Sequence, residues 1–92
     1  MLGLDRVERI VETLHDLRSH EFTITDVVVH RRIVSALLLS NGRRCSVDYM
    51  DPDVRTFCRT LSTNLRESTG HNEFYTLQNG RLIFFLGLED WD

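Results

Sequence analysis

Apolar side chains near the start of the chain recur at helical spacing. Five of them follow each other at intervals of three and four residues, namely Val7, Ile10, Val11, Leu14 and Leu17. That spacing places them on one stripe of a helix with 3.6 residues per turn, while charged residues fill the other side. Asp5 is a suitable N-cap, and a glutamate follows three residues later, as in a capping box. The pattern predicts a helix over residues 5–19.

Residues 21–32 show alternation of apolar and polar side chains instead. Phe22 and Ile24 are separated by threonine, and three consecutive valines follow at positions 27 to 29. β-Branched side chains lose rotamer freedom in a helix and fit a pleated strand. We therefore expect a strand here, followed by a turn near residues 30–32. The competing interpretation is one helix over residues 25–39, because the Ala-Leu-Leu-Leu run at its end favours a helix.

The most apolar stretch, residues 33–50, contains the turn signal Asn41-Gly42. Asn-Gly supplies the two positive-φ residues of a type I′ turn, which matches the twist of a two-stranded hairpin. The stretch therefore predicts two strands paired directly across this turn. In that register one face is almost wholly apolar and combines Val34, Ala36 and Leu38 with Cys45, Val47 and Tyr49.

Residues 51–68 predict a second helix with well-marked ends. Asp51 is a natural N-cap, Pro52 suits the first helical position, and Asp53 favours the positive end of the helix. Gly70 is a suitable C-terminal stop. The apolar stripe of this helix is Val54, Phe57, Cys58, Leu61 and Leu65.

A second Asn-Gly pair, at positions 79 and 80, predicts a second hairpin. It separates two apolar segments, residues 74–78 and 81–86. A two-residue loop at this place makes Leu77 face Leu82 and Tyr75 face Phe84.

Together these elements predict an α+β fold with two layers, an antiparallel sheet that carries helices on one face. The expected order is α-β-β-β-α-β-β, within one domain of residues 1–92, because a chain of this length holds a single core. The order is similar to that of small secretion-chaperone-like folds, which usually add a third helix, and this likeness is one of topology. The alternative is a winged helix, with helices at residues 5–19, 25–39 and 51–68 and the second hairpin as its wing.

Composition and charge narrow the class of protein. Apolar residues make up 41% and charged residues 27% of the chain, which are ordinary globular values, and the formal net charge is −3. The first residues turn acidic and amphipathic at once, unlike a secretory signal. No apolar run reaches the roughly 18–20 residues that a membrane-spanning helix needs. We therefore expect a cytoplasmic protein without membrane association.

The sequence contains no recognisable motif for catalysis, a cofactor or a metal. Cys45 and Cys58 are too few for a disulfide scaffold, and the four histidines have no ligand spacing relative to them. A P-loop, a nucleophile elbow and a dinucleotide-binding glycine motif are all missing from the sequence. Asp51 and Asp53 look like a carboxylate pair, but helix capping accounts for both. The prediction is a protein that is not an enzyme.

The most suggestive candidate for a binding surface is a row of arginines on the second predicted helix. Arg55, Arg59 and Arg66 fall at i, i+4 and i+11, and these positions return to one side of a helix. The predicted turns add Arg43, Arg44 and Arg81. Such a surface suits an acidic protein or a phosphate backbone. Because the net charge is acidic, we expect a protein partner rather than nucleic acid.

A second candidate surface is apolar. Ile33, Leu37 and Leu39 lie on the side of the predicted hairpin that faces away from the helices. Further apolar side chains also need cover, namely Phe74, Ile83, Phe85 and Trp91. A contiguous apolar patch, or an open strand edge, would pair with another protomer. The first set is therefore a candidate homodimer face.

These surfaces lead to two functional hypotheses. The first is a small non-enzymatic interaction module, such as an adaptor, chaperone-like or inhibitor protein, that binds another macromolecule and self-associates through the apolar face. The alternative is a DNA-binding regulator of winged-helix type, in which the arginine row of residues 51–68 reads the major groove. That alternative requires residues 25–39 to be helical.

Overall fold

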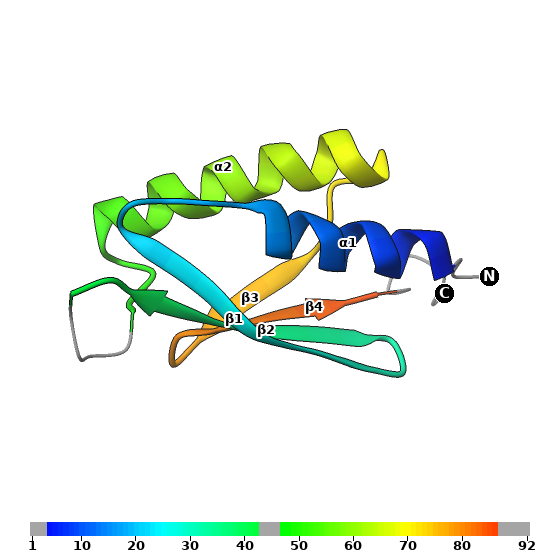
Figure 1. The fold of residues 1–92 in the computed structure, drawn as a ribbon, viewed down its shortest axis with the longest axis horizontal. Helices are drawn as coiled ribbons and strands as arrows, with labels where there is room; N and C mark the ends of the chain where they lie inside the picture. The colour runs from blue at the N-terminus through cyan, green and yellow to red at the C-terminus, as the bar shows by residue number, and fades with distance from the viewer. Residues whose placement is uncertain (1–3, 43–46, 87–92) are drawn as a thin grey trace.

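Both helices lie on one face of a four-stranded antiparallel sheet (Figure 1). The computed structural model describes residues 4–42 and 47–86. The elements are α1 (Leu4–Asp16), β1 (Phe22–His30), β2 (Ile33–Ser40), α2 (Pro52–Thr69), β3 (Tyr75–Gln78) and β4 (Arg81–Phe85). The spatial order of the strands is β1-β2-β4-β3. The predicted α+β class with helices on one face is confirmed.

The second helix begins and ends as its local sequence predicts. The Asp51 side chain accepts a hydrogen bond from the backbone N–H of Asp53 at 2.9 Å. Gly70 takes the left-handed conformation, with φ 76°, and donates its N–H to the carbonyl of Arg66. These are an N-cap and a C-terminal stop of the usual kind. The first helix ends at Asp16, earlier than the expected residue 19. Asp5 lies inside its first turn and is therefore not the N-cap that the sequence predicted.

Residues 25–39 belong to strands, so the winged-helix architecture is wrong. β1 and β2 pair antiparallel from Phe22 opposite Ser40 to His30 opposite Ile33. Arg31 has a φ of 57° in the two-residue turn between them. The β-branched run thus outweighs the helix-friendly Ala-Leu-Leu-Leu segment, which becomes part of β2, the strand between β1 and β4.

β1 contains a bulge that the sequence did not predict. Its register with β2 shifts between Thr25 and Val28, and Asp26 between them has a φ of 52°. A bulge bends its strand and increases the local twist. Because β1 is at an edge of the sheet, the bulge also interrupts the row of backbone groups that the edge would offer to another chain.

The hairpin predicted across Asn41-Gly42 is wrong. β2 pairs with β1 on one edge and with β4 on the other, which leaves no edge for the residues after the turn. Val34, for example, lies opposite Val29 and Phe84 rather than opposite the tyrosine at position 49. Residues 43–46 lie outside the described part of the chain, and residues 47–50 form no strand. An Asn-Gly turn reverses the chain but does not choose the partner strand.

The hairpin across Asn79-Gly80 forms as predicted. Both expected pairs are present, Leu77 opposite Leu82 and Tyr75 opposite Phe84. Asn79 and Gly80 have φ values of 51° and 77°, both positive as a type I′ turn requires. The Gly80 carbonyl also accepts the N–H of Leu38 at 2.7 Å, so this turn extends the contact between β4 and β2.

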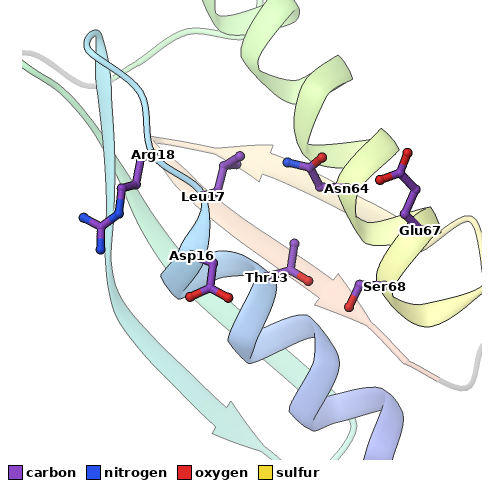
Figure 2. Close-up of a pocket in the computed structure, with 7 residues that line it drawn as sticks. All are labelled: Thr13, Asp16, Leu17, Arg18, Asn64, Glu67 and Ser68. Atoms are coloured by element: carbon purple, nitrogen blue, oxygen red, sulfur yellow. The ribbon is translucent and has the colours of Figure 1, made fainter.

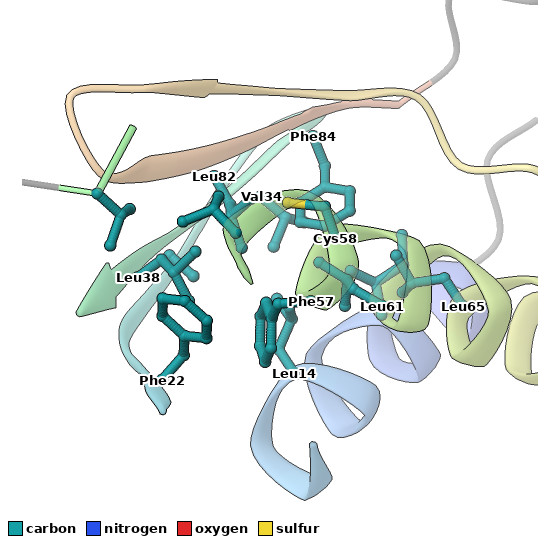
Figure 3. Close-up of a cluster of buried hydrophobic side chains, with 14 of the residues drawn as sticks. Leu14, Phe22, Val34, Leu38, Phe57, Cys58, Leu61, Leu65, Leu82 and Phe84 are labelled. Atoms are coloured by element: carbon teal, nitrogen blue, oxygen red, sulfur yellow. The ribbon is translucent and has the colours of Figure 1, made fainter. Parts of the chain in front are cut away.

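The core lies between the sheet and the two helices (Figure 3). All five residues of the apolar stripe predicted for α2 are buried. The sheet contributes the inward-facing residues Val34, Ala36, Leu38, Leu82 and Phe84. Phe22 of β1 and Phe57 of α2 meet with ring centroids 5.1 Å apart, which joins the edge of the sheet to the helix layer.

A buried ion pair joins α1 to the segment before β3. The Glu73 side chain is fully buried, with 0% exposure, and accepts hydrogen bonds from Arg6. The guanidinium donates through Nε at 2.9 Å and through Nη2 at 2.7 Å, one bond to each carboxylate oxygen. A bidentate pair of this kind satisfies a carboxylate that would be costly to bury alone.

Candidate functional site

Three of the predicted cationic residues form one row on α2. Arg55, Arg59 and Arg66 are all exposed. In the described part of the chain, no carboxylate lies within 4.0 Å of their guanidinium groups. Arg55 makes one long contact, from Nη2 to the carbonyl of Met50 at 3.4 Å. The row therefore offers positive charge that the described residues do not neutralise.

A hollow of about 220 Å³ opens beside the arginine row, where α2 passes β3. Two arginines of the row, Arg55 and Arg59, line it. The remaining lining residues are Tyr49, Cys58, Ser62 and Tyr75. Helical spacing in the sequence predicted the arginines of this site. The two tyrosines come from other segments, which the fold brings next to α2.

The hydroxyl groups in this hollow form a short chain. The Tyr75 hydroxyl donates to the backbone carbonyl of Cys58 at 2.9 Å. Its oxygen also lies 2.9 Å from the Ser62 hydroxyl, and because the phenolic proton is already used, Ser62 is the donor there. Burial raises the pKa of Tyr75 to about 12, and burial also raises the pKa of the Cys58 thiol. At neutral pH these groups are uncharged, so the arginines set the sign of the charge.

The other predicted cationic residues do not join the row. Arg81 is exposed at the start of β4, and its neighbour Leu82 points into the core. Side chains alternate along a strand, so Arg81 lies on the face of the sheet away from α2. Arg43 and Arg44 lie outside the described residues. Of the six arginines predicted for the cationic surface, three form the row on α2 and one, Arg81, lies on the sheet face away from the helices.

Carboxylates line the opposite flank of α2. One hollow of about 410 Å³ lies between the end of α1 and the second half of α2 (Figure 2). A neighbouring hollow of about 380 Å³ lies beside the first half of α2, and both are lined by Leu17 and Arg18. Their carboxylates are Asp16, Glu21, Asp53 and Glu67. Sequence reasoning missed this acidic flank because it combines three separate segments.

The arrangement of these flanks follows from helix geometry. At about 100° per residue, Asp53 and Glu67 fall on one side of α2, and Arg55, Arg59 and Arg66 fall roughly 120° away from them on average. The buried stripe lies between them and faces the sheet. α2 therefore separates a negative flank from a positive one.

The sheet face away from the helices is partly apolar. Ile33 and Leu39 are 41% and 44% exposed, and Leu37 is half-buried. Strand pairing places Phe85 beside Ile33, and Phe85 in turn donates its N–H to the carbonyl of Phe74. Phe74 is 63% exposed. Trp91 lies outside the described residues.

Over residues 4–42 and 47–86, histidine, cysteine, aspartate and glutamate form no group of three that could hold a metal ion. No helix in the same ranges combines the length and the apolar character needed to cross a membrane. The four histidines are all exposed and lie at separate places, namely His15, His20, His30 and His71.

Comparison with known proteins yields no match for this chain, whether to protein-family models, to curated proteins or to solved structures. A functional inference therefore depends on the geometry and charge of the surfaces described above.

Proposed function

We propose that this protein is a small cytoplasmic, non-enzymatic interaction module, of the adaptor, chaperone-like or inhibitor kind, that binds an acidic protein partner through α2. The observation that carries the proposal is the arginine row. Its three guanidinium groups are exposed on one flank of a well-capped helix and have no carboxylate partner among the described residues. Guanidinium groups pair with carboxylates through two parallel hydrogen bonds, so an acidic segment of a partner would supply the missing anions.

The acidic flank of α2 argues against nucleic acid as the partner. The major groove of B-DNA is about 12 Å wide, so a helix in it has a phosphate backbone on each side. One of these backbones would face Asp53 and Glu67, together with the other carboxylates of the acidic flank. These carboxylates would repel the phosphates, and the net charge of −3 adds to the repulsion. A protein partner can instead carry its acidic residues on one side only.

The proposal is tested with poly-L-glutamate as the probe and two variants of equal charge. The first variant changes Arg55, Arg59 and Arg66 to Gln. The matched control removes three exposed arginines elsewhere, by the changes Arg18→Gln, Arg31→Asn and Arg32→Gln. Asn is used at position 31 because this residue has a positive φ, which Asn tolerates.

We expect the first variant to bind the probe about tenfold more weakly than the wild type at low salt, since three exposed ion pairs at about 0.5 kcal/mol each give that factor. The control should stay within about twofold of the wild type. Isothermal titration calorimetry or fluorescence anisotropy measures both affinities. Equal losses in the two variants would show that only total charge matters, and the proposal would then be wrong.

We also propose that the module self-associates through the outer face of its sheet, with a second copy as the occupant. Strands of nine, eight, five and four residues present roughly 400 Å² of sheet. Two copies would bury on the order of 800–1,000 Å² in total, the lower end for a specific interface. The edges are poorer routes, because β1 has a bulge at Asp26 and β3 is short.

A further inference from the structure

Two arginines of the row, Arg55 and Arg59, line the same partly open hollow beside α2. Arg55 and Arg59 are one helical turn apart, which brings their Cβ atoms within about 5–6 Å of each other. Both side chains line the same 220 Å³ hollow. A water molecule occupies about 30 Å³ of liquid, so the hollow can hold a group considerably larger than water. Arg66, farther along the row, does not line it.

The donors in the hollow exceed what the described residues use. Among the described residues, the Arg55 side chain makes only its long contact to the Met50 carbonyl, and each guanidinium has five N–H groups. Tyr49 is 53% exposed at the rim. The Ser62 hydroxyl donates to Tyr75 and can turn toward a ligand without leaving a buried group unpaired, since Tyr75 keeps its own bond to the Cys58 carbonyl.

A tetrahedral dianion fits these donors better than a carboxylate does. A carboxylate has two oxygens in one plane and satisfies one guanidinium fork through two parallel bonds. A phosphoryl group on a side chain carries close to two negative charges and three acceptor oxygens, enough to engage two forks and a hydroxyl together. The two arginine charges also match its charge.

We propose that the hollow formed by Tyr49, Arg55, Arg59, Ser62 and Tyr75 is a subsite for a phosphorylated side chain of the partner. This inference rests on the proposed function and specifies which group of the acidic partner α2 recognises. The remainder of the arginine row, at Arg66, contributes general attraction to the surrounding acidic residues.

The subsite is tested with two labelled peptides of the same acidic sequence. One carries phosphoserine at its central position and the other carries glutamate there. Fluorescence anisotropy gives their affinities for the wild-type protein, for Arg59→Gln, for the matched variant Arg66→Gln and for the triple arginine variant, in which Arg55, Arg59 and Arg66 are all Gln. We expect the wild type to prefer the phosphopeptide about tenfold, in line with one or two added charge-assisted hydrogen bonds. Arg59→Gln should abolish this preference, and Arg66→Gln should weaken both peptides similarly and keep it.

The possible failures separate the two proposals. If the wild type binds both peptides equally while the triple arginine variant still loses both, the subsite is wrong and the proposed function stands. If Arg66→Gln removes the phosphopeptide preference as fully as Arg59→Gln does, the subsite is again wrong. If the triple variant binds both peptides as tightly as the wild type does, both proposals are overturned.

Discussion

At the scale of single residues, Tyr75 links the sheet to the candidate site. Its ring packs against Phe84 with centroids 5.1 Å apart, and its hydroxyl bonds to the Cys58 carbonyl on α2. One side chain therefore links β3 to α2 and also lines the hollow. Burial disfavours the charged form of its phenol and raises the pKa to about 12.

The raised pKa of Tyr75 predicts a loss of stability in alkali. The folded state holds the phenolic proton up to a pKa of about 12, against 10.0 for the ordinary group. The stabilisation by the protonated phenol is therefore fully present below pH 10 and is lost as the pH rises toward 12. We expect the free energy of unfolding, measured with urea, to fall over this range. The raised pKa of Cys58 acts in the same direction.

The control for this prediction is Tyr75→Phe. It keeps the ring packing against Phe84 and removes the titrating hydroxyl, so its stability should fall less steeply with pH than that of the wild type. At neutral pH it should lose about 1 kcal/mol, because the Cys58 carbonyl loses a hydrogen bond. Identical alkaline slopes for the two proteins would mean that Tyr75 is not the group responsible.

At the scale of elements, the sequence predicted what local signals determine. The ends of α2 and its buried stripe follow from Asp51, Gly70 and helical periodicity, and all of them are confirmed. The hairpin at residues 79–80 is confirmed as well. The prediction that β2 pairs with the residues after Gly42 was wrong. Its second neighbour is β4, which is distant in the sequence, and no local signal identifies it. Local sequence supplies turns and faces but not the competition between strands.

The same limit applies to the candidate site. The arginine row could be predicted because its members lie on one helix at helical spacing. The tyrosines that complete the hollow, and the carboxylates of the opposite flank, come from segments brought together by the fold. The Arg6–Glu73 pair likewise joins residues 67 positions apart, and no local pattern signals it.

The Arg6–Glu73 ion pair leads to a prediction about the free energy of unfolding. Arg6→Met would leave the buried Glu73 carboxylate without its main partner, and we expect a loss of about 3–5 kcal/mol in the free energy of unfolding. The double variant Arg6→Met, Glu73→Leu should recover most of that loss, because no charge is then buried alone. Urea unfolding of the three proteins measures both effects. A double variant no more stable than Arg6→Met would contradict the role assigned to the pair.

At the scale of the whole molecule, the helix layer is charged and the outer sheet face is partly apolar. In the proposed function, the helix layer binds the acidic partner and the outer sheet face binds a second copy. Both can be occupied at once, because they lie on opposite sides of the sheet (Figure 1). A dimer would then present two arginine rows facing away from its centre.

Self-association predicts a change in mass with concentration. Because the buried area is small, we expect a dimer with a dissociation constant on the order of micromolar, seen by sedimentation equilibrium. Phe74→Ser with Leu39→Thr should leave a folded monomer at all concentrations tested. Met50→Ser, at a residue that is 72% exposed and outside the sheet, should still dimerise. A wild-type protein that is monomeric up to hundreds of micromolar would exclude the proposed dimer.

The proposed binding surface is the arginine flank of α2, and a titration followed by nuclear magnetic resonance locates the bound probe residue by residue. Poly-L-glutamate is added to isotopically labelled protein, and the shifts of backbone amides and arginine Nε–H groups are mapped onto the structure. We predict that the largest shifts occur at Arg55, Arg59 and Arg66 and at the neighbouring Tyr49 and Tyr75. Shifts concentrated on the acidic flank or on the outer sheet face, or spread evenly over the surface, would show that the arginine flank is not the binding surface.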